Sequence, residues 1–214
     1  MDSIICPLCQ SHHIHAFDRV HGRLYMDCED CGLIHMATGD RPDAATELAR
    51  YQNHQNNPND QGYRRFLDRL VAPLVGRLVP GMEGLDYGSG PGPTLSVMLR
   101  EQGYVMSIYD PFFSVDLHAL DRSYDFVTCT EVAEHFFEPG KEFERLNGLI
   151  RPGGFLAVMT ETYHDQVFAE WRYARDETHV VFYRKKTLQW IADWLDWSTC
   201  FSGKDVVIYK KPID

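Results

Sequence analysis

The second half of the chain alternates short apolar runs with stretches in which apolar residues recur every three or four positions. The short runs predict buried strands at residues 84–88, 104–110, 124–131 and 154–161. The stretches between them predict helices at residues 94–103 and 134–150. Strands and helices in alternation are typical of a mostly parallel sheet that helices cover on both faces, so we expect an α/β fold.

The same pattern extends this core in both directions. Apolar residues at helical spacing predict a helix within residues 63–79 and another at 185–195, and two β-like runs at 198–202 and 205–211 predict a final pair of strands. Residues 52–62, QNHQNNPNDQG, are polar and contain no apolar pattern, with one short helix expected just before them. We therefore divide the chain into a module at 1–38, a linker or lid at 39–61 and an α/β domain at 62–214.

Four of the six cysteines form two CxxC pairs near the N-terminus, separated by eighteen residues, and the hairpin-like segment 15–28 leads into the second pair. This spacing is typical of a zinc ribbon, in which two tight turns present four thiolates to one ion. Ordinary buried cysteines are the alternative, but a module of about forty residues buries too little apolar surface to fold unaided. Four thiolates complete a tetrahedron, so the zinc is expected to be structural. Its predicted ligands are Cys6, Cys9, Cys28 and Cys31.

Composition and charge limit the classes of molecule that the protein is expected to bind. The chain has 214 residues, 44% of them hydrophobic, and its 21 basic and 31 acidic side chains give a net charge of −10. This field repels polyanions, and residues 1–40 alone carry two arginines against six acidic residues. Nucleic-acid binding is therefore disfavoured, and the ribbon is expected to contact a protein partner or to cover a substrate cleft.

Apolar runs are also too short for the roughly 20 residues that cross a bilayer, so no membrane association is expected. The N-terminal residues MDSIICPLC lack the basic and apolar stretches of a secretion signal. A reducing, cytoplasmic location follows as the expectation, in which cysteines bind metal or pack rather than form disulfides.

A glycine-rich loop follows the first predicted core strand. Asp86, Gly88, Gly90 and Gly92 form a DxGxGxG pattern directly before a helix, and glycines at such a turn let the backbone approach a ligand closely. Dinucleotide binding would require a further glycine where Pro93 stands, and the phosphate-binding GK[ST] sequence is missing as well. A turn whose glycines serve packing alone is the competing interpretation.

Asp110 ends the next predicted strand, about twenty residues further on. An acidic side chain at the carboxyl end of such a strand can accept both hydroxyls of a ribose, and ligands of open α/β sheets bind at these strand ends. Alone, Asp110 is equally well explained as a turn residue. Together with the glycine loop it predicts a nucleoside site.

These segments, with YDFVTCTEVAEHF and LIRPGGFLAVMTE, resemble the successive motifs of class I S-adenosylmethionine-dependent methyltransferases over residues 62–214. The resemblance implies a Rossmann-like sheet of seven strands whose last strand is antiparallel. It assigns the cofactor's methionine part to Asp86 and the loop Gly88–Gly92, its ribose to Asp110, and further pocket contacts to Thr130, Glu131 and His135. A zinc ribbon before this fold also resembles subsets of the family that act on ribosomal RNA or nucleotide-linked sugars.

The sequence departs from the family where its third strand belongs. Only thirteen residues separate Asp110 from Tyr124, so the third strand is expected to be shortened or missing and the adenine pocket unusual. Phe112 or Phe113 could stack on adenine and Asp116 accept its amine. Aromatic residues that plug a shortened sheet edge explain the segment equally well.

Methyl transfer depends mainly on alignment and at times on removal of a proton. His179 and His164, in the segment after the fifth strand, are the candidate general bases because imidazole titrates near neutral pH; a structural role is the alternative for both. The basic run 184–186 is interpreted as a solvated face rather than a phosphate contact.

We therefore expect methyl transfer from S-adenosylmethionine to a small molecule or metabolite. The alternatives are an RNA methyltransferase, a non-catalytic protein that binds a partner through its ribbon and, more distantly, a nicotinamide-dependent reductase.

Overall fold

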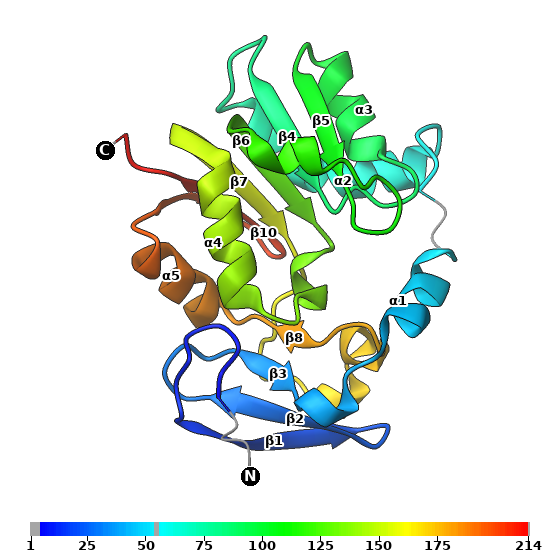
Figure 1. The fold of residues 1–214 in the computed structure, drawn as a ribbon, viewed down its shortest axis with the longest axis vertical. Helices are drawn as coiled ribbons and strands as arrows, with labels where there is room; N and C mark the ends of the chain where they lie inside the picture. Colours follow the sequence, from blue (N-terminus) through cyan, green and yellow to red (C-terminus); the bar gives the residue numbers. More distant parts are fainter. Residues whose placement is uncertain (1–4, 54–55, 214) are drawn as a thin grey trace.

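The structure, a computed structural model, describes residues 5–53 and 56–213 (Figure 1). Two sheets stack along the long axis of the molecule: a large helix-covered sheet built from residues after 80, and a small sheet built mainly from the N-terminal residues. None of the helices within the described residues is long and apolar enough to cross a membrane.

The large sheet has six strands in the order β5-β4-β6-β7-β10-β9. The first four are parallel, whereas β10 runs antiparallel to both β7 and β9. This arrangement confirms the α/β fold and the antiparallel final strand. The bounds are β4 Glu83–Tyr87, β5 Val105–Tyr109, β6 Tyr124–Thr130, β7 Ile150–Met159, β9 Ser198–Ser202 and β10 Val206–Lys210.

Within the described residues the sheet therefore has six strands, where the family pattern has seven. The missing strand is the third, whose place the short segment after Asp110 had put in question. That segment forms a turn, in which Asp110 and Ser114 make an isolated bridge, and a 3-10 helix η2 at Leu117–Asp121. Thirteen residues cannot supply both a covering helix and a full strand, so β5 is the edge of the sheet.

Helices cover both faces of the large sheet because its side chains alternate along each strand. On β7, Ala157 and Met159 join the apolar cluster under α2 and α3, while Leu156 and Val158 join the cluster under α4 and α5. Both clusters are fully buried at their centres. The helix bounds are α2 Gln61–Val75, α3 Thr94–Glu101, α4 Pro139–Leu149 and α5 Lys185–Trp194.

The small sheet contains the predicted N-terminal hairpin and one strand from far along the chain. Its order is β1-β2-β3-β8, with bounds Ile14–Val20, Arg23–Cys28, Ile34–Met36 and Val181–Phe182. The antiparallel pairing of β3 with β8 joins the ribbon to the segment after β7 (Figure 1). Aromatic residues of that segment, Phe168, Trp171 and Tyr173, are buried in the core that it shares with the ribbon.

The basic run 184–186 is only partly the solvated face that the sequence predicted: Lys185 and Lys186 are exposed, whereas Arg184 is half-buried. Both terminal nitrogens of Arg184 donate to the carboxylate of Asp27, each at 2.7 Å, and one of them also reaches the carbonyl of Gly32 at 2.7 Å. Lys186 donates to the carbonyl of Glu29 at 3.0 Å. Sequence patterns miss these contacts because their partners lie more than 150 positions away.

Candidate functional site

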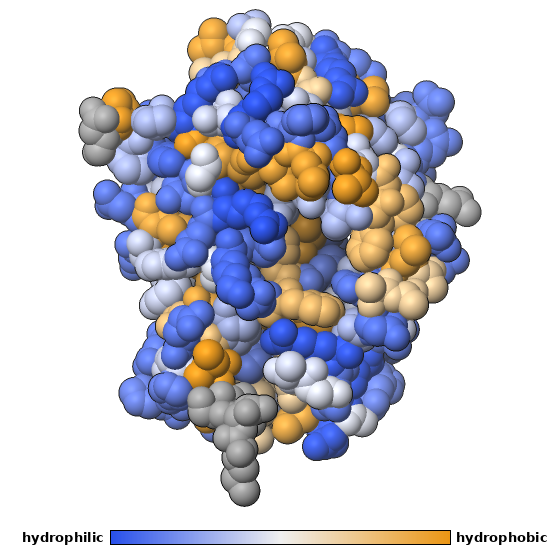
Figure 2. Space-filling model, in the orientation of Figure 1, coloured by the Kyte–Doolittle hydropathy of each residue, from blue (hydrophilic) through white to orange (hydrophobic). Residues whose placement is uncertain are grey.

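A cavity of about 540 Å³ opens at the carboxyl ends of β4, β5 and β6. The space-filling view shows the molecule hollowed between its two halves, with apolar residues at the mouth (Figure 2). All seven residues predicted to contact the cofactor line this one cavity: Asp86, Gly88, Gly90, Gly92, Asp110, Thr130 and Glu131. Parallel strands bring their carboxyl ends to the same edge of a sheet, which is why residues from three separate loops meet here.

The turn after β4 needs glycine at two positions. Gly88 and Gly90 have φ angles of 81° and 64°, in the left-handed region that other residues rarely adopt. A Cβ on Gly88 would lie 2.3 Å from the side chain of Val132 in the loop after β6. The backbone at Gly88 therefore lies in close contact with Val132 of the loop after β6, at the cavity wall.

Asp110 connects this turn to the loop after β5. Its Oδ2 accepts a hydrogen bond from the Gly90 N–H at 2.9 Å. Its Oδ1 accepts from the N–H groups of Phe112 and Phe113 at 2.8 and 3.0 Å. Asp110 is 7% exposed. A carboxylate offers about four lone-pair sites, so one remains for a ligand after these three bonds.

Asp86 lies deeper, at the end of β4. Its two carboxyl oxygens accept hydrogen bonds from the hydroxyls of Ser96 at 3.1 Å and Thr128 at 3.0 Å. Burial raises the pKa of Asp86 to about 6, an effect that the two hydroxyls only partly offset. The negative charge of Asp86 is thus poorly compensated by the protein, and a cationic ligand group would stabilise it.

Two hydroxyl groups at the cavity wall lack a partner among the described residues. They belong to Ser89, in the glycine loop, and Thr130, at the end of β6. Buried hydroxyls normally form hydrogen bonds, so these two are suited to a polar ligand. Glu131 follows Thr130 with a φ of 54°, and burial together with the nearby Glu134 raises its pKa to about 9.

The described parts of the linker, residues 39–53 and 56–61, contribute a wall of the cavity. Helix α1, Ala44–Tyr51, places Glu47 and Tyr51 there, and Asn56 follows. The Asn56 carbonyl accepts a hydrogen bond from Thr94 Oγ1 at 3.0 Å, and a Cβ on Gly92 would lie 2.2 Å from that carbonyl. The sequence predicted a linker or lid here, but the polar composition of the segment gave no signal for which of its residues face the cavity.

The aromatic residues of the shortened segment lie at the cavity, and its candidate acceptor does not. Phe112 and Phe113 are lining residues, and the Phe112 ring lies 5.5 Å from that of Tyr51. Asp116 is not among the lining residues; its side chain instead accepts from the N–H of His118 at the start of η2.

Neither predicted general base lines the cavity. His164 hydrogen-bonds through Nε2 to Thr162 Oγ1 at 2.8 Å, away from the lining residues. His179 is 9% exposed and lies behind His135, whose ring centre is 4.8 Å away. Burial lowers the pKa of His179 below its usual value, so this imidazole is neutral near pH 7. His135 is the histidine that reaches the cavity.

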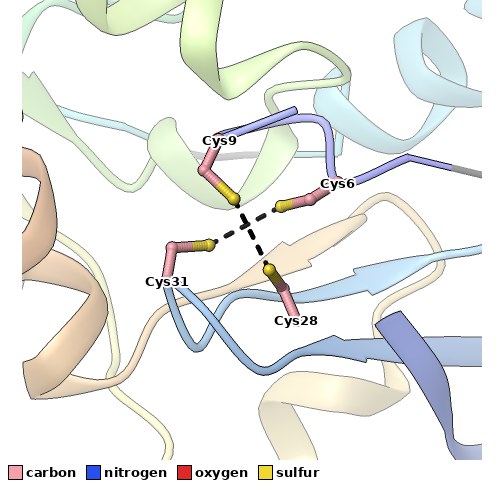
Figure 3. A group of neighbouring side chains, drawn as sticks. All are labelled: Cys6, Cys9, Cys28 and Cys31. Carbon is pink, nitrogen blue, oxygen red and sulfur yellow. Dashed lines mark hydrogen bonds between the residues drawn. The ribbon is translucent and has the colours of Figure 1, made fainter. Parts of the chain in front are cut away.

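The four N-terminal cysteines converge as their spacing predicted (Figure 3). Cys6 Sγ lies 3.6 Å from Cys31 Sγ, and Cys9 Sγ lies 3.5 Å from Cys28 Sγ. A disulfide needs about 2.05 Å, whereas four sulfurs at 2.3 Å from a tetrahedral zinc are about 3.8 Å apart. The geometry therefore fits a closed tetrathiolate site. The first CxxC turn also packs on α4, because the Gly140 N–H donates to the Pro7 carbonyl at 3.2 Å.

Comparison with known proteins agrees with this geometry. A family model described as "Methyltransferase domain" matches residues 59–198. No curated protein sequence matches the chain significantly. Among solved structures, magnesium protoporphyrin IX methyltransferase from Synechocystis PCC 6803 with bound SAH has a TM-score of 0.55 at 17% identity, over 78% of this chain and 93% of that one.

A second solved structure is similar over nearly the whole chain. It is the 1,6-didemethyltoxoflavin-N1-methyltransferase of Burkholderia thailandensis, with its acceptor and S-adenosylhomocysteine bound. The TM-score is 0.55 at 13% identity, over 94% of this chain and 99% of that one. At these identities the likeness shows the fold.

Proposed function

Because this chain belongs to the methyltransferase-domain family, we propose that it transfers a methyl group from S-adenosylmethionine to a small-molecule acceptor. The observation that carries the proposal is one shared cavity. The glycine turn, the Asp110 carboxylate and two unpartnered hydroxyls all lie along its wall.

Different residues of the cavity wall would bind the methionine, ribose and adenine parts of the cofactor. The turn at Gly88–Gly92 would hold the methionine part, whose ammonium group would balance the buried charge of Asp86. Asp110 would accept a ribose hydroxyl with its remaining lone pair. Phe112 or Phe113 would stack on the adenine, since both line the cavity. Asp116 lies off the cavity, so we do not assign the adenine amine to it.

When bound, S-adenosylmethionine supplies an electrophilic methyl group on a positively charged sulfur. The chain's own contribution is to align the acceptor and exclude water. We assign both tasks partly to residues 39–61, as a lid. Arg50 of α1 pairs with Asp176, its Nε and Nη2 lying 2.9 and 2.6 Å from the same carboxylate oxygen. This ion pair would hold the lid against the segment that follows β7.

A small molecule is favoured as acceptor because the cavity is walled by α1 and the net charge of −10 repels nucleic acid. The two similar methyltransferases described above are named for magnesium protoporphyrin IX and 1,6-didemethyltoxoflavin, which are small molecules as well. Zinc on Cys6, Cys9, Cys28 and Cys31 would have a structural role, since four thiolates leave no open position for chemistry.

The test is transfer of tritium from methyl-labelled S-adenosylmethionine to a cell extract separated into small-molecule, RNA and protein fractions. The proposal expects label in the small-molecule fraction. Label confined to RNA would establish the alternative acceptor class. No transfer into any fraction, with S-adenosylhomocysteine binding intact, would favour a non-catalytic binding protein.

A further inference from the structure

Three potential metal ligands meet beside the cavity, in a group separate from the cysteine cluster. They are a carboxylate oxygen of Glu134 and one ring nitrogen each of His135 and His179, all within 4.8 Å of one another. The first two belong to the 3-10 helix η3, Ala133–His135, and the third precedes β8. Pairing of the ribbon with the segment after β7 therefore completes the cluster.

Both imidazoles are oriented in the same way. Nδ1 of His135 lies 2.8 Å from the Thr178 carbonyl, and Nδ1 of His179 lies 2.8 Å from the Tyr173 carbonyl. A carbonyl only accepts, so each Nδ1 carries a proton, and the neutral form of such a ring presents its lone pair at Nε2. A backbone carbonyl on the outer ring nitrogen is the usual support of a metal-binding histidine.

Glu134 is held as firmly. It is 1% exposed, one oxygen accepts from the Tyr173 hydroxyl, and the other accepts from Thr160 Oγ1 at 3.0 Å. None of the ion pairs among the described residues involves Glu134. A buried carboxylate without a cation is costly, whereas a bound divalent ion would compensate its charge.

We propose that Glu134, His135 and His179 bind a divalent cation at the wall of the methyltransferase cavity. Ligands at about 2.1 Å from one ion lie up to about 4.2 Å apart, so a small side-chain rotation from the present spacing completes the site. Two imidazoles and a carboxylate suit ions such as Mn²⁺, whereas the thiolate cluster selects softer ions. Three protein ligands leave positions open for other oxygen donors.

Because His135 lines the cavity, those open positions would be available to the acceptor. This step rests on the proposed function, and it narrows the acceptor to a molecule with a hydroxyl or a neighbouring pair of oxygens. A bound cation lowers the pKa of a coordinated hydroxyl, so the hydroxyl would release its proton to solvent water without a histidine base. The resulting oxygen anion would form the new bond to the methyl group as the sulfur–methyl bond breaks, with S-adenosylhomocysteine as the leaving group. His179, one of the two histidines predicted as candidate bases, would then be a metal ligand instead.

Mn²⁺ binding to the full-length protein tests the site, with electron paramagnetic resonance reporting the free ion. The proposal expects one bound Mn²⁺ per chain, and at least tenfold weaker binding in Glu134→Gln and His135→Ala. The matched control is His118→Ala, an exposed histidine on η2 that should leave Mn²⁺ affinity unchanged. No bound Mn²⁺ in the wild type, or equal affinity in all four proteins, would overturn the proposal.

A second measurement needs no variant. In the wild-type protein, Mn²⁺ should broaden the imidazole NMR signals of His135 and His179 while that of His118 stays sharp; broadening confined to other histidines contradicts the site. S-adenosylhomocysteine binding to the same sample separates the two proposals. If the protein binds Mn²⁺ but not S-adenosylhomocysteine, only the proposed function is contradicted. If it binds S-adenosylhomocysteine but not Mn²⁺, only the metal site is contradicted.

Discussion

Gly90 and Asp110 lie twenty residues apart in the chain and are joined by a hydrogen bond of 2.9 Å from the Gly90 N–H to Asp110 Oδ2. The bond fixes the turn after β4 against the loop after β5. The residue assigned to the ribose thus also shapes the loop assigned to the methionine part. A change at either position should therefore affect the whole cofactor site.

Asp110→Ala removes the acceptor of three backbone N–H groups as well as the proposed ribose contact. Hydrogen bonds to a charged group contribute about 1.5–3 kcal/mol each. We expect S-adenosylhomocysteine to bind at least tenfold more weakly and the melting temperature to fall. Asp121→Ala, at an exposed position of η2, is the control and should change neither quantity. Undiminished binding by Asp110→Ala would remove Asp110 from the site.

The raised pKa of Asp86 should make the free energy of unfolding depend on pH. Its pKa is raised to about 6 from 3.8, so the folded state retains a proton that the unfolded state releases. The stability that this group contributes is complete below pH 4 and is lost as the pH rises through 6. The difference corresponds to about 3 kcal/mol. Asp86→Asn should lack this loss, so its stability relative to the wild type should rise between pH 4 and 7.

Urea unfolding of both proteins across that range measures the effect. A stability difference that stays constant with pH would show that Asp86 titrates normally in the folded protein. Saturating S-adenosylmethionine should reduce the pH dependence of the wild type, because the ligand's cationic groups favour the ionised carboxylate.

The ion pair between Arg184 and Asp27 should be a main link between the ribbon and the large domain. The two side chains are only 18% and 15% exposed, so removing one partner leaves a poorly solvated charge. We expect Arg184→Met to cost about 3 kcal/mol of unfolding free energy. The double variant with Asp27→Asn should cost less than the two single variants added together. Additive costs in this double-mutant cycle would mean that the pair contributes nothing of its own.

The N-terminal module should require bound zinc for its folded stability. Cys28→Ser removes one of four converging thiolates and is expected to lower the zinc content and cost about 3 kcal/mol or more of stability. Cys200→Ser is the matched control, because Cys200 lies in β9, away from the cluster. Full zinc content in Cys28→Ser, measured by mass spectrometry of the metal, would contradict the tetrathiolate assignment.

The features that the sequence predicted correctly follow from local patterns: the ends of parallel strands, the spacing of the cysteines and the length of the segment after Asp110. Parallel strands end at one edge, so Asp86, Asp110 and Thr130 had to lie near one another once the strands were identified. CxxC spacing likewise placed the four thiols. The thirteen residues after Asp110 were too few for a strand and its helix, and the third strand is indeed missing from the sheet.

Contacts between distant segments account for what the sequence missed. The pairing of Val181–Phe182 with β3 depends on tertiary packing that no local pattern encodes. The same holds for the partners of Arg184 and for the histidine cluster. His164 and His179 were chosen as bases because of their residue type, but their positions relative to the cavity follow from that pairing. Residue chemistry thus identified candidates, and only the fold could place them.

The central claim is that the turn at Gly88–Gly92 holds the amino-acid end of S-adenosylmethionine. Calorimetric titration of S-adenosylhomocysteine into the wild type and Gly90→Val tests it most directly, with Gly148→Ala as a folded control because a Cβ there meets nothing within 4 Å. We predict one binding site in the wild type and control, and none in Gly90→Val. Equal affinity in all three proteins, or no binding to the wild type, would contradict the account.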